Sequence, residues 1–100
     1  MVRKITRDAI RAFRTNKNFK RDNTWVQIIH GRRFLHLHGN VIAELTQHGE
    51  LFVTSAGWQT TTTKERLNGF GSIVNIQQKD FQWFLNGEAW NGELIKVWPK

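Results

Sequence analysis

The chain has no cysteine and no tyrosine, and only one proline and one methionine. Without cysteine it has no disulfide framework, no thiolate metal site and no cysteine nucleophile. A cytosolic compartment fits, although the lack of cysteine alone also permits secretion. The N-terminus is charged, which argues against a signal peptide, and no apolar run approaches the ~18 residues of a membrane span. Because 39% of the residues are hydrophobic and proline is rare, a folded protein is expected rather than a disordered one.

The 100 residues predict a single domain over 1–100, with a basic helix and linker in 1–23 and a sheet-rich body in 24–100. Lysine and arginine outnumber acidic residues by 15 to 8, which gives a net charge of +7. Residues 1–33 contain ten basic and two acidic residues, whereas 34–100 contain five basic and six acidic ones. The excess therefore lies in the first third and makes a polyanion the first partner to consider.

Residues 5–15 have the period of an amphipathic helix. Its apolar arc consists of Ile5, Ala9, Ala12 and Phe13. Thr6 and Asp8 suit the start of the helix, because a hydroxyl and an early acidic residue satisfy free N–H groups. The Asn16–Asn18 segment suits its end, and the polar, charged residues 19–23 are interpreted as a linker.

From Thr24 the hydrophobic period changes to two, which indicates strands over 24–30 and 33–38 around a Gly31-Arg32 turn. This register places Ile29 opposite Phe34, Gln27 opposite His36 and Trp25 opposite His38. One face then forms the core with Val26, Ile28, Leu35 and Leu37. After a Gly39-Asn40 turn, residues 41–45 and 51–55 extend the antiparallel meander.

Thr62 and Glu65 have capping-box spacing, which predicts a second short helix near 62–69 that ends at Gly69. Strand patterns return over 71–78, 80–86, 88–90 and 93–98, and Asn86-Gly87 is a strong hairpin signal. The fold class is therefore α+β: an antiparallel sheet of about six short strands, packed with an N-terminal amphipathic helix and the second short helix.

Two motifs, GW-x-T-x-TTK-x-RLN and W-x-LNG-x-x-W, occupy part of the region from about 38 to 92. Their residues are Gly57, Trp58, Thr60, Thr62, Thr63, Lys64, Arg66, Leu67, Asn68, Trp83, Leu85, Asn86, Gly87 and Trp90. The pattern resembles small bacteriophage proteins of unassigned function. The resemblance implies a phage origin and a product inside an infected bacterium, but no reaction. The basic N-terminal third lies outside the resembling region, so its role is expected to be particular to this protein.

The arginines of the first helix are the leading candidate site. Arg7, Arg11 and Arg14 have i, i+4, i+7 spacing, so their guanidinium groups form a row that suits a phosphate backbone or the carboxylates of an acidic protein. A solvated helix face is the alternative. The complete set of candidate binding residues is Arg3, Arg7, Arg11, Arg14, Lys17, Lys20, Arg21, Arg32 and Arg33.

The other face of the first hairpin carries Trp25 and Phe34, which are candidates for stacking on nucleic-acid bases. The favoured interpretation is that the first helix packs on this face and covers it. His36 and His38 are two residues apart on a strand, but no third ligand is evident, so no metal site is expected.

The threonine run supplies a candidate phosphate seat at Thr62, Thr63 and Lys64, although helix capping is the preferred role. Trp58 is expected to anchor the preceding loop in the core. Trp83, Trp90 and Trp98 are expected to be structural, with Trp98 a candidate for exposure.

No enzyme is expected, since Ser55 and Ser72 lack a nucleophile motif and no P-loop is present. No cofactor is implied. The sequence favours a small phage accessory protein that binds nucleic acid through the basic helix face. The alternative is a phage inhibitor that binds and inactivates an acidic host protein, such as a defence, transcription or replication factor. Both would act in the cytoplasm of the infected bacterium, without a membrane partner.

Overall fold

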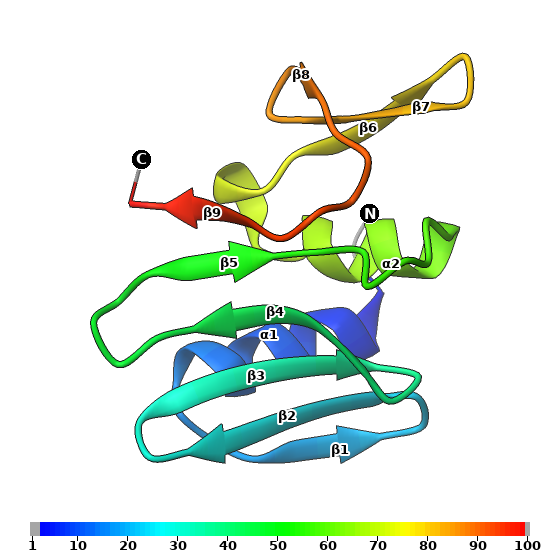
Figure 1. Ribbon diagram of the computed structural model, residues 1–100. Coiled ribbons are helices and arrows are strands. Elements are labelled where there is room, and N and C mark those ends of the chain that lie inside the picture. The colour runs from blue at the N-terminus through cyan, green and yellow to red at the C-terminus, as the bar shows by residue number, and fades with distance from the viewer. Residues whose placement is uncertain (1–2, 100) are drawn as a thin grey trace.

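The computed structural model describes residues 3–99, which form two α-helices, one short 3-10 turn and nine strands (Figure 1). In chain order these are α1 (Lys4–Arg14), β1 (Phe19–Arg21), β2 (Thr24–Ile29), β3 (Arg32–Leu37), β4 (Asn40–Leu45), β5 (Leu51–Val53), α2 (Thr61–Asn68), η1 (Gly71–Ile73), β6 (Ile76–Lys79), β7 (Gln82–Leu85), β8 (Glu88–Ala89) and β9 (Ile95–Trp98).

The main sheet has six antiparallel strands in the order β1-β2-β3-β4-β5-β9, which confirms the predicted α+β class with its two helices (Figure 1). Strands β6, β7 and β8 form a separate three-stranded sheet. Asn68, the last residue of α2, connects this second sheet to the helix. Its side-chain amide donates to the Ile76 carbonyl at 3.1 Å and accepts from the Ile76 N–H at 2.7 Å. These bonds fix the start of β6 beside α2, and after β8 the chain returns to the main sheet as β9.

The first hairpin turns at His30-Gly31, one residue earlier than predicted. Both residues have positive φ, +49° and +81°, as a tight two-residue hairpin turn requires. Ile29 therefore lies opposite Arg32, and Trp25 lies opposite His36. The predicted pairing is wrong by two residues, but a shift of two leaves every side chain on its predicted face. The next turn likewise falls at His38-Gly39 rather than at Gly39-Asn40.

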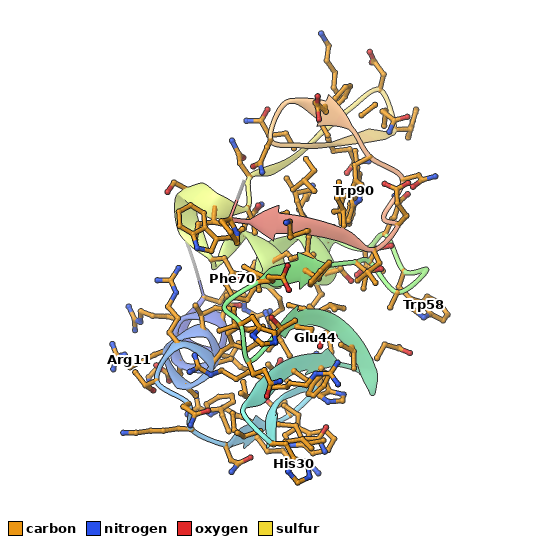
Figure 2. The ribbon with its side chains drawn as sticks, turned by 60° about the vertical axis from the view of Figure 1, so that its left-hand side comes forward. Arg11, His30, Glu44, Trp58, Phe70 and Trp90 are labelled. Carbon is orange, nitrogen blue, oxygen red and sulfur yellow. The ribbon has the colours of Figure 1, made fainter. Side chains whose placement is uncertain are left out.

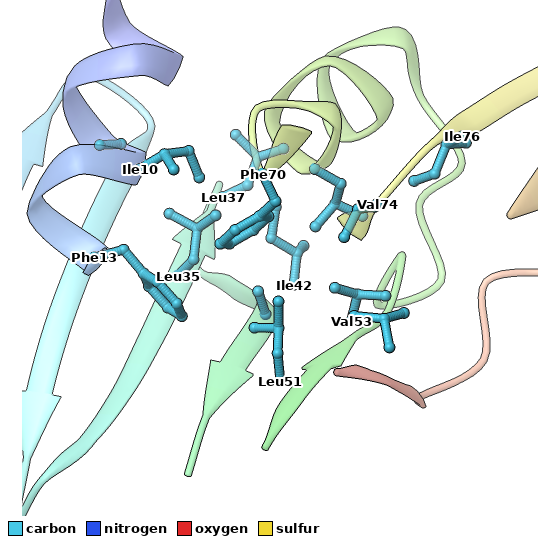
Figure 3. Close-up of a cluster of buried hydrophobic side chains, with 14 of the residues drawn as sticks. Ile10, Phe13, Leu35, Leu37, Ile42, Leu51, Val53, Phe70, Val74 and Ile76 are labelled. Atoms are coloured by element: carbon cyan, nitrogen blue, oxygen red, sulfur yellow. The ribbon is translucent and has the colours of Figure 1, made fainter. Parts of the chain in front are cut away.

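The core lies between the main sheet and the helices (Figure 3). Phe13 of α1 meets Phe70 edge to face with ring centroids 5.2 Å apart, and both are buried. The predicted core residues Val26, Leu35 and Leu37 are also buried. Burial of each such side chain stabilises the fold by about 1.5–3 kcal/mol. The main core cluster contains Ala9, Ile10, Ala12, Phe13, Val26, Leu35, Leu37, Ile42, Ala43, Leu51, Val53, Leu67, Phe70, Val74, Ile76, Trp83, Leu85, Trp90 and Val97.

The linker predicted over 19–23 is wrong, because Phe19–Arg21 forms β1. Phe19 pairs with Val26 and packs against the core, which explains how a mostly charged segment becomes an edge strand. The end of α1 near Asn16 is confirmed: the helix stops at Arg14, and Asn16 has a φ of +60°. Its predicted start is wrong, because α1 begins at Lys4 and Thr6 lies inside the first turn.

The two helices are joined by polar side chains where they meet. The Glu65 carboxylate accepts from the Arg3 N–H at 3.1 Å and from the Thr6 hydroxyl, so α2 supplies the N-terminal cap of α1. The Arg66 guanidinium, 2% exposed, donates to Thr24 Oγ1 at 3.0 Å and Thr6 Oγ1 at 2.9 Å. It also pairs with Glu65. These bonds hold the N-terminal end of α1 against α2.

Candidate nucleic-acid interface

The outer face of α1 carries the predicted arginine row, and its side chains line a depression. Arg7, Arg11 and Arg14 border about 440 Å³ of space together with Ile10, Thr15 and Gly69. All three arginines are exposed, and among residues 3–99 no acidic side chain borders the depression. Figure 2 shows Arg11 at the periphery of the molecule on the α1 side. Three guanidinium groups along one depression form a site for an anion with several charges.

The arginines of the row differ in their anchoring. Arg14 donates from Nη2 to the Phe70 carbonyl at 2.7 Å, which also fixes the end of α1 to the segment after α2. Within residues 3–99, Arg7 and Arg11 form no ion pair. Their charges are therefore available to an external partner.

The one acidic residue of α1 lies on a different flank of the helix. Asp8 accepts from Lys4 Nζ at 2.9 Å and from Arg21 Nη1 of β1 at 3.0 Å. These two hydrogen bonds hold the pKa of the Asp8 carboxyl below its ordinary value, and the bond from Lys4 has the larger effect. The carboxylate is thus neutralised by its own neighbours and leaves the row to the arginines.

Besides Arg14, three arginines of the predicted set have structural partners of their own. Arg21 pairs with Asp8, and Arg32 pairs with Glu44 while its guanidinium lies over the Phe34 ring. Arg33 donates to the Phe13 and Arg14 carbonyls at 3.1 and 3.2 Å, where it caps the C-terminal end of α1. Acidic partners thus offset the charges of Arg21 and Arg32, whereas Arg33 is held by carbonyl groups and keeps its charge.

The prediction that α1 covers Trp25 and Phe34 is wrong, because α1 packs on the opposite face of the sheet, against Val26 and Leu35. Trp25 is covered instead by its own neighbours. The His36 ring stacks on it at 4.4 Å between centroids, and Lys20 Nζ lies 5.8 Å from its ring. Partial burial lowers the pKa of His36, whose ring also contacts Gln27 Oε1 at 3.0 Å. The arginine row and the predicted stacking residues therefore lie on different sides of the sheet.

The threonine run caps α2 two residues earlier than the predicted capping box. The Thr60 hydroxyl accepts from the Thr63 N–H at 3.1 Å, so Thr60 rather than Thr62 is the N-cap. Thr63 is buried, and Lys64 Nζ donates to Gln78 Oε1 at 3.3 Å. Of the predicted phosphate seat, Thr62 and Thr63 border a second depression, and Lys64 does not.

The predictions for Trp83, Trp90 and Trp98 are confirmed, and the prediction for Trp58 is wrong. Trp83 and Trp90 are buried in the core, and Trp98 is exposed by 48%. Trp58, predicted to anchor its loop in the core, is 61% exposed. Its loop follows β5 through Ala56 and Gly57, both with positive φ, and this path carries the side chain outward (Figure 2).

The part of the chain described by the structure contains no cluster of three or more His, Asp or Glu side chains that could hold a metal ion. Between residues 3 and 99, no helix has both the length and the apolar character needed to cross a bilayer.

A comparison with protein families identifies the origin of this chain. The family model of the Kyanoviridae Gp96 protein, from bacteriophages, matches residues 2–96. The chain belongs to this phage family. Searches of curated proteins and of solved structures found no match.

The Kyanoviridae Gp96 match corrects one expectation from the sequence. It includes α1 and the whole basic first third, which was expected to lie outside the family region of about 38–92. The arginine row of this Gp96 family member therefore lies within the segment that the family model describes.

Proposed function

We propose that this phage accessory protein binds nucleic acid, without catalysis, through the arginine row of α1. One observation carries the proposal: Arg7, Arg11 and Arg14 border a single depression from which acidic side chains are absent among the described residues. Guanidinium groups bind phosphate oxygens in a bidentate manner, and a row of them follows the sugar–phosphate backbone without reading bases. The expected binding is weakly sequence-specific and takes place in the cytoplasm of the infected host.

The test compares two double charge reversals by fluorescence anisotropy with labelled 20-nucleotide DNA, single- and double-stranded. Arg7→Glu with Arg11→Glu replaces two arginines of the row whose side chains have no ion pair within residues 3–99. Lys79→Glu with Lys96→Glu changes the net charge equally on β6 and β9. The α1 variant is expected to bind at least about tenfold more weakly than the control variant, because several phosphate contacts are lost. Equal affinities of the two variants, with folding verified by circular dichroism, would contradict the proposal.

A second candidate function is the capture of a host protein, and Phe81 favours it. This side chain is 96% exposed in the turn between β6 and β7, where Asp80 and Phe81 have φ values of +52° and +68°. A fully exposed aromatic ring on a strained turn is typical of an anchor for a pocket in another protein. Nuclease-resistant, stoichiometric recovery of one host protein from lysate, lost on Phe81→Ala, would favour this function over nucleic-acid binding.

A further inference from the structure

A second depression, of about 400 Å³, lies at the N-terminal end of α2, and Trp58 forms one of its walls. Its volume falls within the range of sites for small ligands, about 300–1,000 Å³. Buried Leu37 and Ile42 supply apolar surface, and His38, Asn40 and Thr62 supply polar groups. The depression thus combines an aromatic wall, apolar surface and hydrogen-bonding groups.

The backbone at Trp58 is held in place although the side chain is exposed. The Trp58 N–H donates to the Ser55 carbonyl at 2.9 Å, and the Trp58 carbonyl accepts from the Thr60 N–H at 3.0 Å. The backbone is therefore held on both sides of the residue, which reduces the entropy cost of ordering it on a ligand. Unlike Trp25, which lies between His36 and Lys20, Trp58 offers an open ring face for stacking.

The polar groups restrict the kind of ligand. His38 Nε2 lies 3.4 Å from Asn23 Nδ2, and the Asn40 amide donates to the His38 carbonyl at 3.4 Å, so both side chains are positioned. An aliphatic ligand would remove these groups from water without replacing their hydrogen bonds, which is unfavourable. A planar heterocycle with a polar edge satisfies both the indole wall and the polar groups.

We propose that this depression receives an unpaired base of single-stranded nucleic acid, stacked on Trp58 with its polar edge toward Asn40 and Thr62. The choice of ligand rests on the proposed nucleic-acid function. The assignment adds a preference for single strands, since a base within a duplex has no free face to stack on a side chain.

The helix α2 connects this depression to the arginine row. Thr62, near its start, borders the Trp58 depression, and Gly69, just after its end, borders the arginine depression. Eight helical residues span about 12 Å. Figure 2 shows Arg11 and Trp58 on opposite sides of the molecule, so a strand that contacts both must be several nucleotides long.

The first arm of the test uses adenosine, which lacks phosphate and does not depend on the arginine row. On titration into the ¹⁵N-labelled chain, the indole N–H signal of Trp58 is expected to shift while those of buried Trp83 and Trp90 stay in place. Trp58→Ala assigns the signal by its disappearance. The proposal is overturned if the Trp58 signal stays unchanged at millimolar adenosine, or if Trp98 shifts to the same extent.

The second arm compares a 12-nucleotide DNA strand with an abasic strand of equal length. Trp58→Ala is expected to weaken binding of the base-containing strand at least about fivefold and to leave the abasic strand unaffected, because one stacking contact is lost. Trp58→Phe retains a ring and should restore part of the affinity, whereas Trp98→Ala, on β9, serves as the matched control.

The outcomes separate this inference from the proposed function. If the wild-type chain binds both strands equally, the base pocket is wrong and the arginine row stands. If adenosine shifts Trp58 while neither strand binds, the pocket holds a free nucleoside and the assignment to a strand is overturned, together with the proposed function.

Discussion

Arg66 is the charged residue on which the junction of the two helices depends. Its guanidinium is buried and bonded to Thr6, Thr24 and Glu65. Replacement by methionine would fill much of the space but leave Glu65 without its ion-pair partner and the two threonine hydroxyls without the guanidinium donor. Removal of one partner from a buried pair typically costs about 3–5 kcal/mol. Since Glu65 is partly exposed, Arg66→Met is expected to lower the free energy of unfolding by about 3 kcal/mol.

Urea unfolding followed by tryptophan fluorescence measures this change. Arg7→Met is the matched control, because it removes the same group from an exposed helix position, and its effect should stay within about 0.5 kcal/mol. A similar midpoint for the two variants would show that the Arg66 contacts contribute no more than a surface arginine.

At the scale of elements, the approach of α1 to α2 depends on Gly69. A Cβ atom at this position would lie 2.5 Å from Thr6 Cγ2 and 3.0 Å from Ile10 Cγ1. Gly69→Ala is therefore expected to destabilise the chain by about 1–3 kcal/mol through overpacking. Thr6→Ser removes the closest methyl group and keeps the hydroxyl that bonds Glu65 and Arg66.

The double variant Gly69→Ala with Thr6→Ser should recover part of the stability lost in the single Gly69 variant. Thermal unfolding of the wild type, both single variants and the double variant gives the coupling free energy between the two positions. Additive effects would mean that the helices separate to accommodate the methyl group rather than clash at Thr6.

At the scale of the whole molecule, much of the positive charge of the first third is not offset by ion pairs. Of its ten basic residues, three form ion pairs within residues 3–99: Lys4, Arg21 and Arg32. Binding through phosphates should therefore weaken steeply with salt. Each phosphate contact contributes about 0.9 to the slope of log K against log salt on duplex DNA.

Arg7→Gln with Arg11→Gln is thus expected to reduce that slope by about 2, while Lys79→Gln with Lys96→Gln leaves it unchanged at the same net charge. Titrations of duplex DNA between 50 and 200 mM salt measure the slopes. If both variants reduce the slope alike, binding depends on overall charge rather than on the α1 row.

The local patterns of the sequence were sufficient to predict most helices and strands but not how these elements pack against one another. The spacing of Ile5, Ala9 and Phe13 predicts α1, and alternation predicts β2 and β3 with their faces correctly divided. The choice of face for α1 was wrong because both faces of this hairpin carry large side chains. Periodicity cannot decide between two such faces, since each would bury comparable apolar area.

The residues missed by sequence reasoning depend on contacts that are distant in the chain. Arg66 has an acidic neighbour in the sequence, which is typical of a surface residue. It is buried because it bonds to Thr6 and Thr24, which lie 60 and 42 positions away in the chain. Trp58 reads as a core residue because most tryptophans are largely buried. Positive φ at Ala56 and Gly57 turns the loop outward, and no hydrophobic pattern signals that geometry.

The cap that Glu65 provides for α1 has a consequence for the order of folding. The Arg3 N–H and the Glu65 carboxylate are 62 positions apart, so this bond closes a loop of more than half the chain. An isolated helix of 11 residues is marginal in water, and α1 also lacks a cap from its own N-cap side chain. During synthesis, α1 therefore receives this cap only after α2 has emerged from the ribosome and docked. A nascent chain that has not yet reached α2 would accordingly carry the positive charge of residues 1–33 without this link between α1 and α2.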